Sequence, residues 1–138
     1  MADAKDALQT LHTRVIDSRE GYEQAQENID GDSTFVQRCV EERASFHEAI
    51  HRQMTAEGID VDESGSAAAQ AHRGLFKIRD VLSSGDSGIY AECARGDEYL
   101  KSAYDDAIEA TRGDAVWDFL VEQRARVDAA IKEAKTLS

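Results

Sequence analysis

The chain contains no proline in its 138 residues. Proline breaks helix interiors because it lacks a backbone donor and clashes with the preceding turn, so its absence leaves every segment free to be helical. The abundant residues are Ala, Glu, Asp, Lys, Arg and Gln, which mostly tolerate or favour helices. The hydrophobic fraction of 41% is too high for a disordered chain. The composition therefore predicts an all-α protein.

Long hydrophobic runs and clusters of basic residues are also missing. No apolar run approaches the roughly 18 residues of a membrane-spanning helix, and residues 1–6 lack the pattern of a signal peptide. The net charge of −12 repels the phosphates of nucleic acids and of anionic membrane surfaces. We therefore expect a cytoplasmic protein that binds neither nucleic acid nor membranes.

Cysteine is scarce, and the two that are present form no motif. Cys39 and Cys93 each fall on an apolar helix stripe, which predicts buried, reduced thiols. A disulfide between them would need an oxidising compartment, and nothing in the sequence indicates one.

Apolar residues recur at intervals of three and four along five segments, which predicts five helices in one domain spanning residues 1–138. The helices cover about residues 3–29, 33–57, 66–84, 89–111 and 114 onwards. The inward positions of the four long helices are Leu8, Leu11, Val15, Tyr22, Ala25, Ile29, Val36, Cys39, Phe46, Ile50, Met54, Ile89, Cys93, Gly96, Leu100, Ala103, Ala107, Trp117, Leu120, Val127, Ile131 and Ala134.

Turn residues separate these helices and suggest a topology. Asp32 or Ser33 can cap the second helix and Gly58 can end it, residues 85–88 form a turn, and Asp114 can cap the last helix. Short loops then give two antiparallel hairpins, and the third helix carries the chain back along the bundle. This is the one-crossover arrangement of ferritin-like four-helix bundles, although an up-down five-helix array has the same sequential directions.

The spacing of Glu48-Ala-Ile-His51 matches half of a di-iron site, in which a Glu-x-x-His pair projects into the bundle. At 100° per residue, however, Glu48 lies roughly 170° and His51 roughly 110° from the centre of the apolar stripe. The long helices offer no second Glu-x-x-His pair. We therefore expect this pair on a solvated face, where His47 and His51 at i, i+4 can chelate zinc or nickel only adventitiously.

Acidic residues beside the core offer a second hypothesis. Glu42, Glu92 and Asp97 flank the apolar stripes of the second and fourth helices, and Arg43 falls almost within a stripe. The carboxylates can pair with arginines as structural ion pairs, or they can form a buried metal site. Because Arg43 already supplies positive charge, the structural interpretation is favoured.

Several stretches resemble a bacterial family of small ferritin-like four-helix-bundle proteins of unknown function. They are Gly65-Ser66 with His72-Arg73, residues 91–98 with Ala103-Tyr104, residues 121–123, residues 17–22 with Glu27, and Glu42-Arg43 with Phe46. They occur in the family's order and spacing over almost the whole chain. Ala94 and Ile131 stand where family members often carry an acid and a histidine, which removes two potential metal ligands.

The resemblance implies a ferritin-like bundle and draws attention to polar residues at helix boundaries. His72 is expected to tie the crossover helix to the bundle through a carboxylate, either Glu27 or Glu92. The residues expected to form a structural polar network are Glu27, Arg43, His72, Arg73, Arg95, Tyr104 and Gln123.

Because this fold hosts many functions, the resemblance does not define an activity. We favour a small, acidic, non-catalytic protein that acts through binding or assembly, with a protein partner or with itself as a homodimer, and we predict no cofactor. The alternative is a metal-carboxylate protein that handles iron or oxidants, with iron or another divalent metal at Glu42, Glu92 and Asp97.

Overall fold

The computed structural model describes residues 4–61, 81 and 84–138, and within this part the secondary structure is entirely helical. The helices are α1 (Ala4–Asn28), α2 (Thr34–Ala56), α5 (Gly85–Ala110), the 3₁₀ helix η2 (Ala115–Trp117) and α6 (Phe119–Leu137). The predicted all-α class is confirmed. The predicted crossover helix, with His72 and Arg73, lies outside the described residues apart from its last positions.

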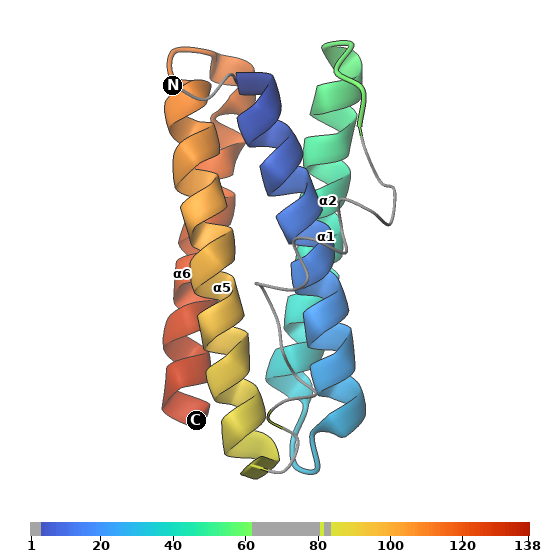
Figure 1. Cartoon of the computed structure of the whole chain (residues 1–138), viewed down its shortest axis with the longest axis vertical. Helices are drawn as coiled ribbons and strands as arrows, with labels where there is room; N and C mark the ends of the chain where they lie inside the picture. The colour runs from blue at the N-terminus through green and yellow to red at the C-terminus, as the bar shows by residue number, and fades with distance from the viewer. Residues whose placement is uncertain (1–3, 62–80, 82–83) are drawn as a thin grey trace.

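The four α-helices form a bundle of two antiparallel hairpins, α1 with α2 and α5 with α6 (Figure 1). The two hairpins pack together chiefly through α1 and α5. Helix α2 ends at the end of the bundle opposite to the one where α5 begins, so these two helices run in the same direction (Figure 1). The predicted four-helix bundle and its helix directions are therefore confirmed for this part of the chain. None of the described helices is long and apolar enough to cross a membrane.

Helix α2 ends at Gly58, as predicted. Gly58 has a φ of 74°, in the left-handed region that favours glycine. Its N–H donates to the carbonyl of Thr55 at 3.0 Å, and the N–H of Ile59 donates to the carbonyl of Met54 at 2.9 Å. These two bonds form a Schellman motif, which satisfies the last carbonyl groups of the helix.

Helix α5 begins earlier than predicted, because only the first residue of the expected turn, Gly85, leaves helical geometry, with a φ of 74°. The carboxylate of Asp86 accepts hydrogen bonds from the backbone N–H groups of Asp30 and Gly31, both at 2.9 Å. The first turn of α5 is thus fixed against the connection between α1 and α2. A Cβ atom at Gly31 would lie 3.1 Å from Asp86 Oδ2, so any other residue here would push the Asp86 carboxylate slightly away.

The predicted side-chain cap at Asp114 is wrong, because Asp114 makes no side-chain cap hydrogen bond and the helix η2 follows it. The added turn buries Trp117, whose indole Nε1 donates to the carboxylate of Glu57 at 3.1 and 3.2 Å. Helix α6 then begins at Phe119. Burial of one large aromatic side chain therefore sets the geometry of this connection.

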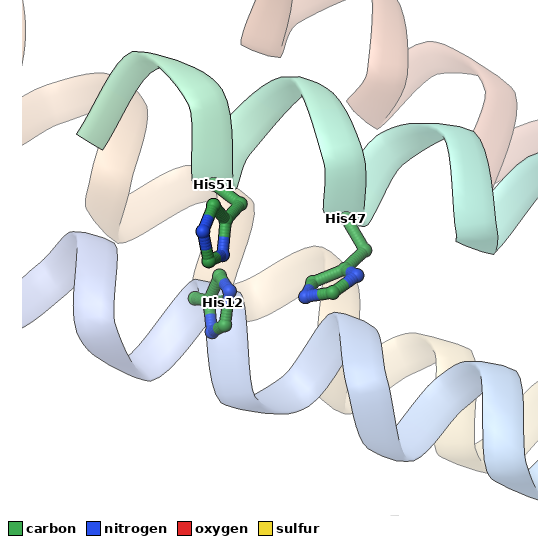
Figure 2. Close-up of side chains that lie close together, drawn as sticks. All are labelled: His12, His47 and His51. Carbon is green, nitrogen blue, oxygen red and sulfur yellow. The ribbon is translucent and has the colours of Figure 1, made fainter. Parts of the chain in front are cut away.

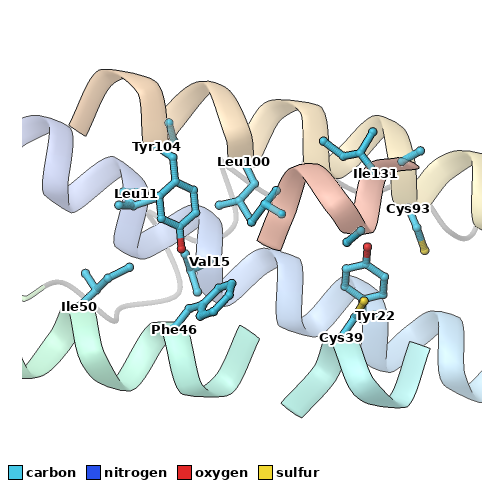
Figure 3. Packing of buried hydrophobic residues seen from close by; sticks show 14 of the residues in the cluster. Leu11, Val15, Tyr22, Cys39, Phe46, Ile50, Cys93, Leu100, Tyr104 and Ile131 are labelled. Carbon is cyan, nitrogen blue, oxygen red and sulfur yellow. The ribbon is translucent and has the colours of Figure 1, made fainter. Parts of the chain in front are cut away.

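The core lies between the four helices, where all predicted inward positions except the half-buried Ile29 are buried (Figure 3). Aromatic side chains from different helices pack against one another. The rings of Phe46 in α2 and Tyr104 in α5 pack edge to face, with their centroids 6.5 Å apart. Cys39 and Cys93 are buried and free, as predicted. Burial raises the pKa of Cys39 to about 12, so this thiol stays protonated at neutral pH.

Candidate metal centre

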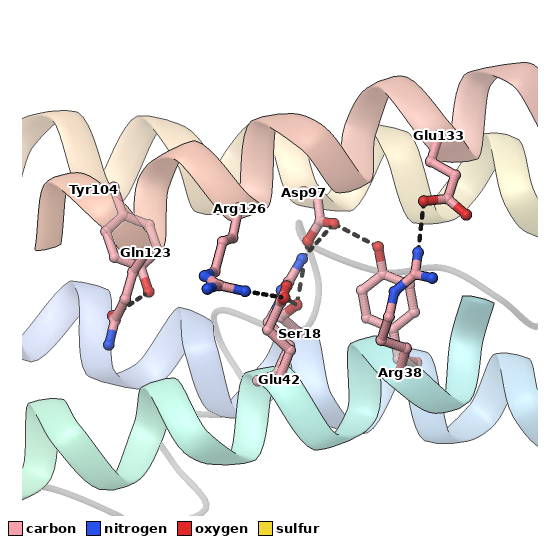
Figure 4. A network of polar contacts seen from close by, with 10 residues as sticks. Ser18, Arg38, Glu42, Asp97, Tyr104, Gln123, Arg126 and Glu133 are labelled. Carbon is pink, nitrogen blue, oxygen red and sulfur yellow. Dashed lines mark hydrogen bonds and ion pairs between the residues drawn. The ribbon is translucent and has the colours of Figure 1, made fainter. Parts of the chain in front are cut away.

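The buried guanidinium of Arg43 forms ion pairs with the carboxylates of both Glu42 and Asp97. Figure 4 labels these two acids within the polar network between the helices. Arg43 Nη1 donates to Glu42 Oε1 at 2.6 Å, and Nη2 donates to Asp97 Oδ2 at 2.9 Å. The guanidinium therefore supplies the positive charge between the two carboxylates that a metal ion would otherwise supply.

Asp97 is fully buried, and further hydrogen bonds satisfy it. Ser18 Oγ donates to Asp97 Oδ1 at 3.2 Å, the hydroxyl of Tyr22 donates to Oδ2, and Arg43 Nε donates to Ser18 Oγ at 3.1 Å. Burial raises the pKa of Asp97 against the opposing charge of Arg43. Burial alone would lower the pKa of Arg43, but Asp97 keeps it above its ordinary value. This network ties α1, α2 and α5 together.

Glu92 takes no part in the contacts of Arg43 with Glu42 and Asp97. Its buried carboxylate accepts hydrogen bonds from Arg95 Nε at 2.8 and 3.0 Å, within the same helix. Among the described residues, Glu42, Glu92 and Asp97 do not form a group whose ligand atoms converge as in a metal site. The structure thus places these acids in arginine pairs and does not bring the three together.

The remaining residues of the predicted polar network have different outcomes. Tyr104 donates from its hydroxyl to Gln123 Oε1 at 2.8 Å, which links α5 with α6 inside the bundle. Glu27 is exposed on α1. His72 and Arg73 lie outside the described residues, so the proposed tie through His72 stays a prediction.

A different group of residues, of types that can ligate a metal ion, lies between α1 and α2. His12 from α1 meets His47 and His51 from α2, with one ligand atom of each residue within 4.8 Å of the others (Figure 2). The ring centroid of His12 lies 4.7 Å from that of His47 and 5.6 Å from that of His51. His12 is fully buried, whereas His47 and His51 are half-buried.

The expectation of a solvated face is right for Glu48 and wrong for His51. Glu48 is exposed and pairs with Arg52 at 2.6 Å. His51 instead lies against His12, as does His47, one helical turn earlier (Figure 2). An angle from the centre of the apolar stripe takes no account of the neighbouring helix, and α1 covers the side of α2 that carries these histidines. The covered face of α2 is therefore wider than its apolar stripe.

The sequence pattern did not predict His12 as a ligand, because it is a single polar residue beside an apolar stripe. The register in which α1 pairs with α2 does indicate its position. Ser18 contacts Arg43 across the hairpin. In an antiparallel pair, the residue six positions before Ser18 lies level with the residue six positions after Arg43. His12 is thus level with Ala49, midway between His47 and His51.

Three imidazoles in this arrangement can bind a transition-metal ion. A tetrahedral zinc site needs metal–nitrogen distances of about 2.0–2.1 Å, which places the nitrogens roughly 3.3 Å apart. The observed separations, all within 4.8 Å, require modest side-chain rotations to reach this geometry. With three protein ligands, the fourth coordination position of such an ion stays open.

A further buried carboxylate, Asp17 on α1, lies outside both groups. Within the described structure neither of its oxygen atoms accepts a hydrogen bond. Burial raises its pKa to about 7 from an ordinary value of 3.8, and the charge of Glu20 adds a smaller rise. Because the folded-state pKa is raised, the stability contributed by protonated Asp17 is complete below about pH 4 and is lost as pH rises through about 7.

Replacing Asp17 with asparagine should therefore stabilise the protein at pH 8 by about 1 to 3 kcal/mol, because it removes a buried, unpaired charge. The gain should shrink towards zero at pH 4.5. Urea unfolding at the two pH values measures the difference. The exposed Asp106→Asn variant is the control, and an equal response from both variants would contradict the assignment.

Comparison with known proteins gives one match. The model of a family described as a domain of unknown function (DUF2383) matches residues 3–110, which include the three histidines and the Arg43–Asp97 pair. No curated protein and no solved structure matches the chain.

Proposed function

The chain belongs to the DUF2383 family, whose function is unknown, and we propose that this protein binds one divalent transition-metal ion through His12, His47 and His51. The convergence of one ligand atom from each histidine within 4.8 Å carries the proposal. The three side chains come from two neighbouring helices, so a bound ion would also link α1 to α2.

The ligand set favours particular metals. Imidazole nitrogen suits zinc, copper, nickel and iron, whereas magnesium and calcium prefer oxygen ligands. The group contains no carboxylate, so it differs from the two-histidine, one-carboxylate site of non-haem iron oxygenases. Zinc, nickel, cobalt and copper are therefore the metals that fit it best.

Two further features support cation binding. The net charge of −12 produces a negative potential that raises the local concentration of divalent cations. His47 and His51 are half-buried, which leaves a path for an ion from solvent, while His12 lies beneath them in the bundle. A site of this kind combines a preformed inner ligand with two accessible ones.

The proposal retains the non-catalytic binding role expected from the sequence and gives the ligand a chemical class. Metal binding by the carboxylates Glu42, Glu92 and Asp97 is the weaker candidate, because arginines already pair with all three. A protein partner or homodimer stays a prediction.

Protein purified without an affinity tag should bind one Zn²⁺ per chain, measured by competition with a chromophoric chelator. Binding only to the folded state should raise the free energy of unfolding by about 2.7 kcal/mol when Zn²⁺ is at 100 times its dissociation constant. Removing the ion with a chelator should reverse this gain and leave helix content unchanged, because the apolar core forms without metal. Failure to bind Zn²⁺, Co²⁺ or Ni²⁺ in stoichiometric amount would contradict the proposal.

A further inference from the structure

An open pocket of about 650 Å³ lies beside the three-histidine group. Two of the metal-ligating residues, His47 and His51, form part of its wall, and His12 does not. The other described residues that line it are Arg19, Ala44, Glu48, Arg52 and Thr55. An ion held by the histidines would therefore border this pocket with its fourth coordination position available to a ligand.

Arg19, one of the described lining residues, has a side chain whose hydrogen bonding is incomplete. Its Nε atom is buried and makes no hydrogen bond within the described structure. The carboxylate of Glu23 neutralises its charge only loosely, with Oε1 at 3.5 Å from Nε. A buried N–H donor on the wall of a pocket is a position where a ligand oxygen would gain a hydrogen bond.

Helix geometry directs Arg19 towards the histidines. Arg19 follows His12 by seven residues, which places both on the same face of α1, about 10 Å apart along its axis. Side chains on a helix lean towards its N-terminus, so the long Arg19 side chain can reach back towards the level of His12. A carboxylate has two oxygens, one for the metal and one for the guanidinium.

We propose, on the basis of the metal site above, that this pocket binds a small monocarboxylate with a short apolar chain. One carboxylate oxygen occupies the fourth position of the metal ion, and the other accepts a hydrogen bond from Arg19. Guanidinium groups match carboxylates in charge and planar geometry. Ala44 and the alkyl stems of Arg19 and Arg52 provide apolar wall for the hydrocarbon chain.

Co²⁺-loaded, tag-free protein provides the test, because the visible absorption of Co²⁺ changes when its fourth ligand changes. Titration with butyrate should give a saturable spectral change, with a lower dissociation constant than acetate. The Arg19→Met variant should bind Co²⁺ with an affinity within twofold of the parent protein and bind butyrate at least fivefold more weakly. Arg112→Met, which alters an arginine that is 78% exposed, is the matched control and should behave as the parent does.

The outcomes separate the two proposals. A normal Co²⁺ spectrum that butyrate does not change would overturn the carboxylate pocket and leave the metal site intact. Equal butyrate affinity in the parent and Arg19→Met proteins would overturn the assignment of Arg19. Absence of stoichiometric Co²⁺ binding in the first step would instead overturn the proposed function.

Discussion

Replacing Arg43 with methionine should lower the free energy of unfolding by about 3 to 5 kcal/mol, because it leaves the carboxylate of Asp97 buried without its cation. Both side chains are fully buried. The guanidinium also lies 5.4 Å from the ring centroid of Tyr22 and 5.5 Å from that of Phe46, so its removal disturbs aromatic packing as well. Urea denaturation monitored by circular dichroism measures the loss.

Two variants test the cause of this loss. Arg126→Met removes an arginine that is 56% exposed and lies 3.8 Å from Glu42, and it should cost less than about 1 kcal/mol. Arg43→Met combined with Asp97→Leu should recover much of the stability, since replacement of both members of a buried pair is often tolerated. If Arg43→Met were no more harmful than Arg126→Met, the network would not have the structural role assigned to it.

Replacing His12 with leucine should weaken Zn²⁺ binding by at least about 10-fold. Loss of an outer partner of a metal ligand already costs about 10- to 100-fold in affinity, and loss of a ligand should cost no less. Leucine suits the fully buried position, so the fold should remain intact. Isothermal titration calorimetry measures the affinity, and circular dichroism verifies the helix content.

Glu48→Gln is the matched control for this prediction. It removes the carboxylate of the Glu48-Ala-Ile-His51 pair and leaves the three imidazoles in place. Zn²⁺ affinity should stay within twofold of the parent, because Glu48 pairs with Arg52 on the exposed side of α2. A large loss of affinity in this variant would favour the Glu-x-x-His ligand pair over the three-histidine site.

The helices and their buried faces could be predicted because both depend on local periodicity. Residues such as Leu11, Phe46 and Leu100 recur at helical spacing and are all buried. The stop at Gly58 was also predictable, since a left-handed residue at the end of a helix favours glycine. The starts of α5 and α6 depend on contacts between distant segments, namely Asp86 with Gly31 and Trp117 with Glu57. The spacing of apolar residues along one helix does not predict such contacts.

The histidine group was harder to predict for a related physical reason. A metal site joins residues that are distant in the chain, and only the register of the α1–α2 hairpin places His12 between His47 and His51. The angular position of His51 on α2 wrongly predicted a solvent-exposed side chain. The neighbouring helix α1, rather than the apolar stripe, determines which side chains on this face of α2 are covered. The pairing of Arg43 with Glu42 was easier to anticipate, because a charged residue within an apolar stripe requires an opposite charge nearby.

Nuclear magnetic resonance of protein carrying ¹⁵N-labelled histidine tests the central claim most directly. The chain has four histidines, so their imidazole signals can be assigned with single substitutions. The metal-site account predicts that the signals of His12, His47 and His51 change together and stop changing at one equivalent of Zn²⁺. Changes confined to His47 and His51, with His12 unaffected, would show an adventitious chelate on α2 and would contradict the account.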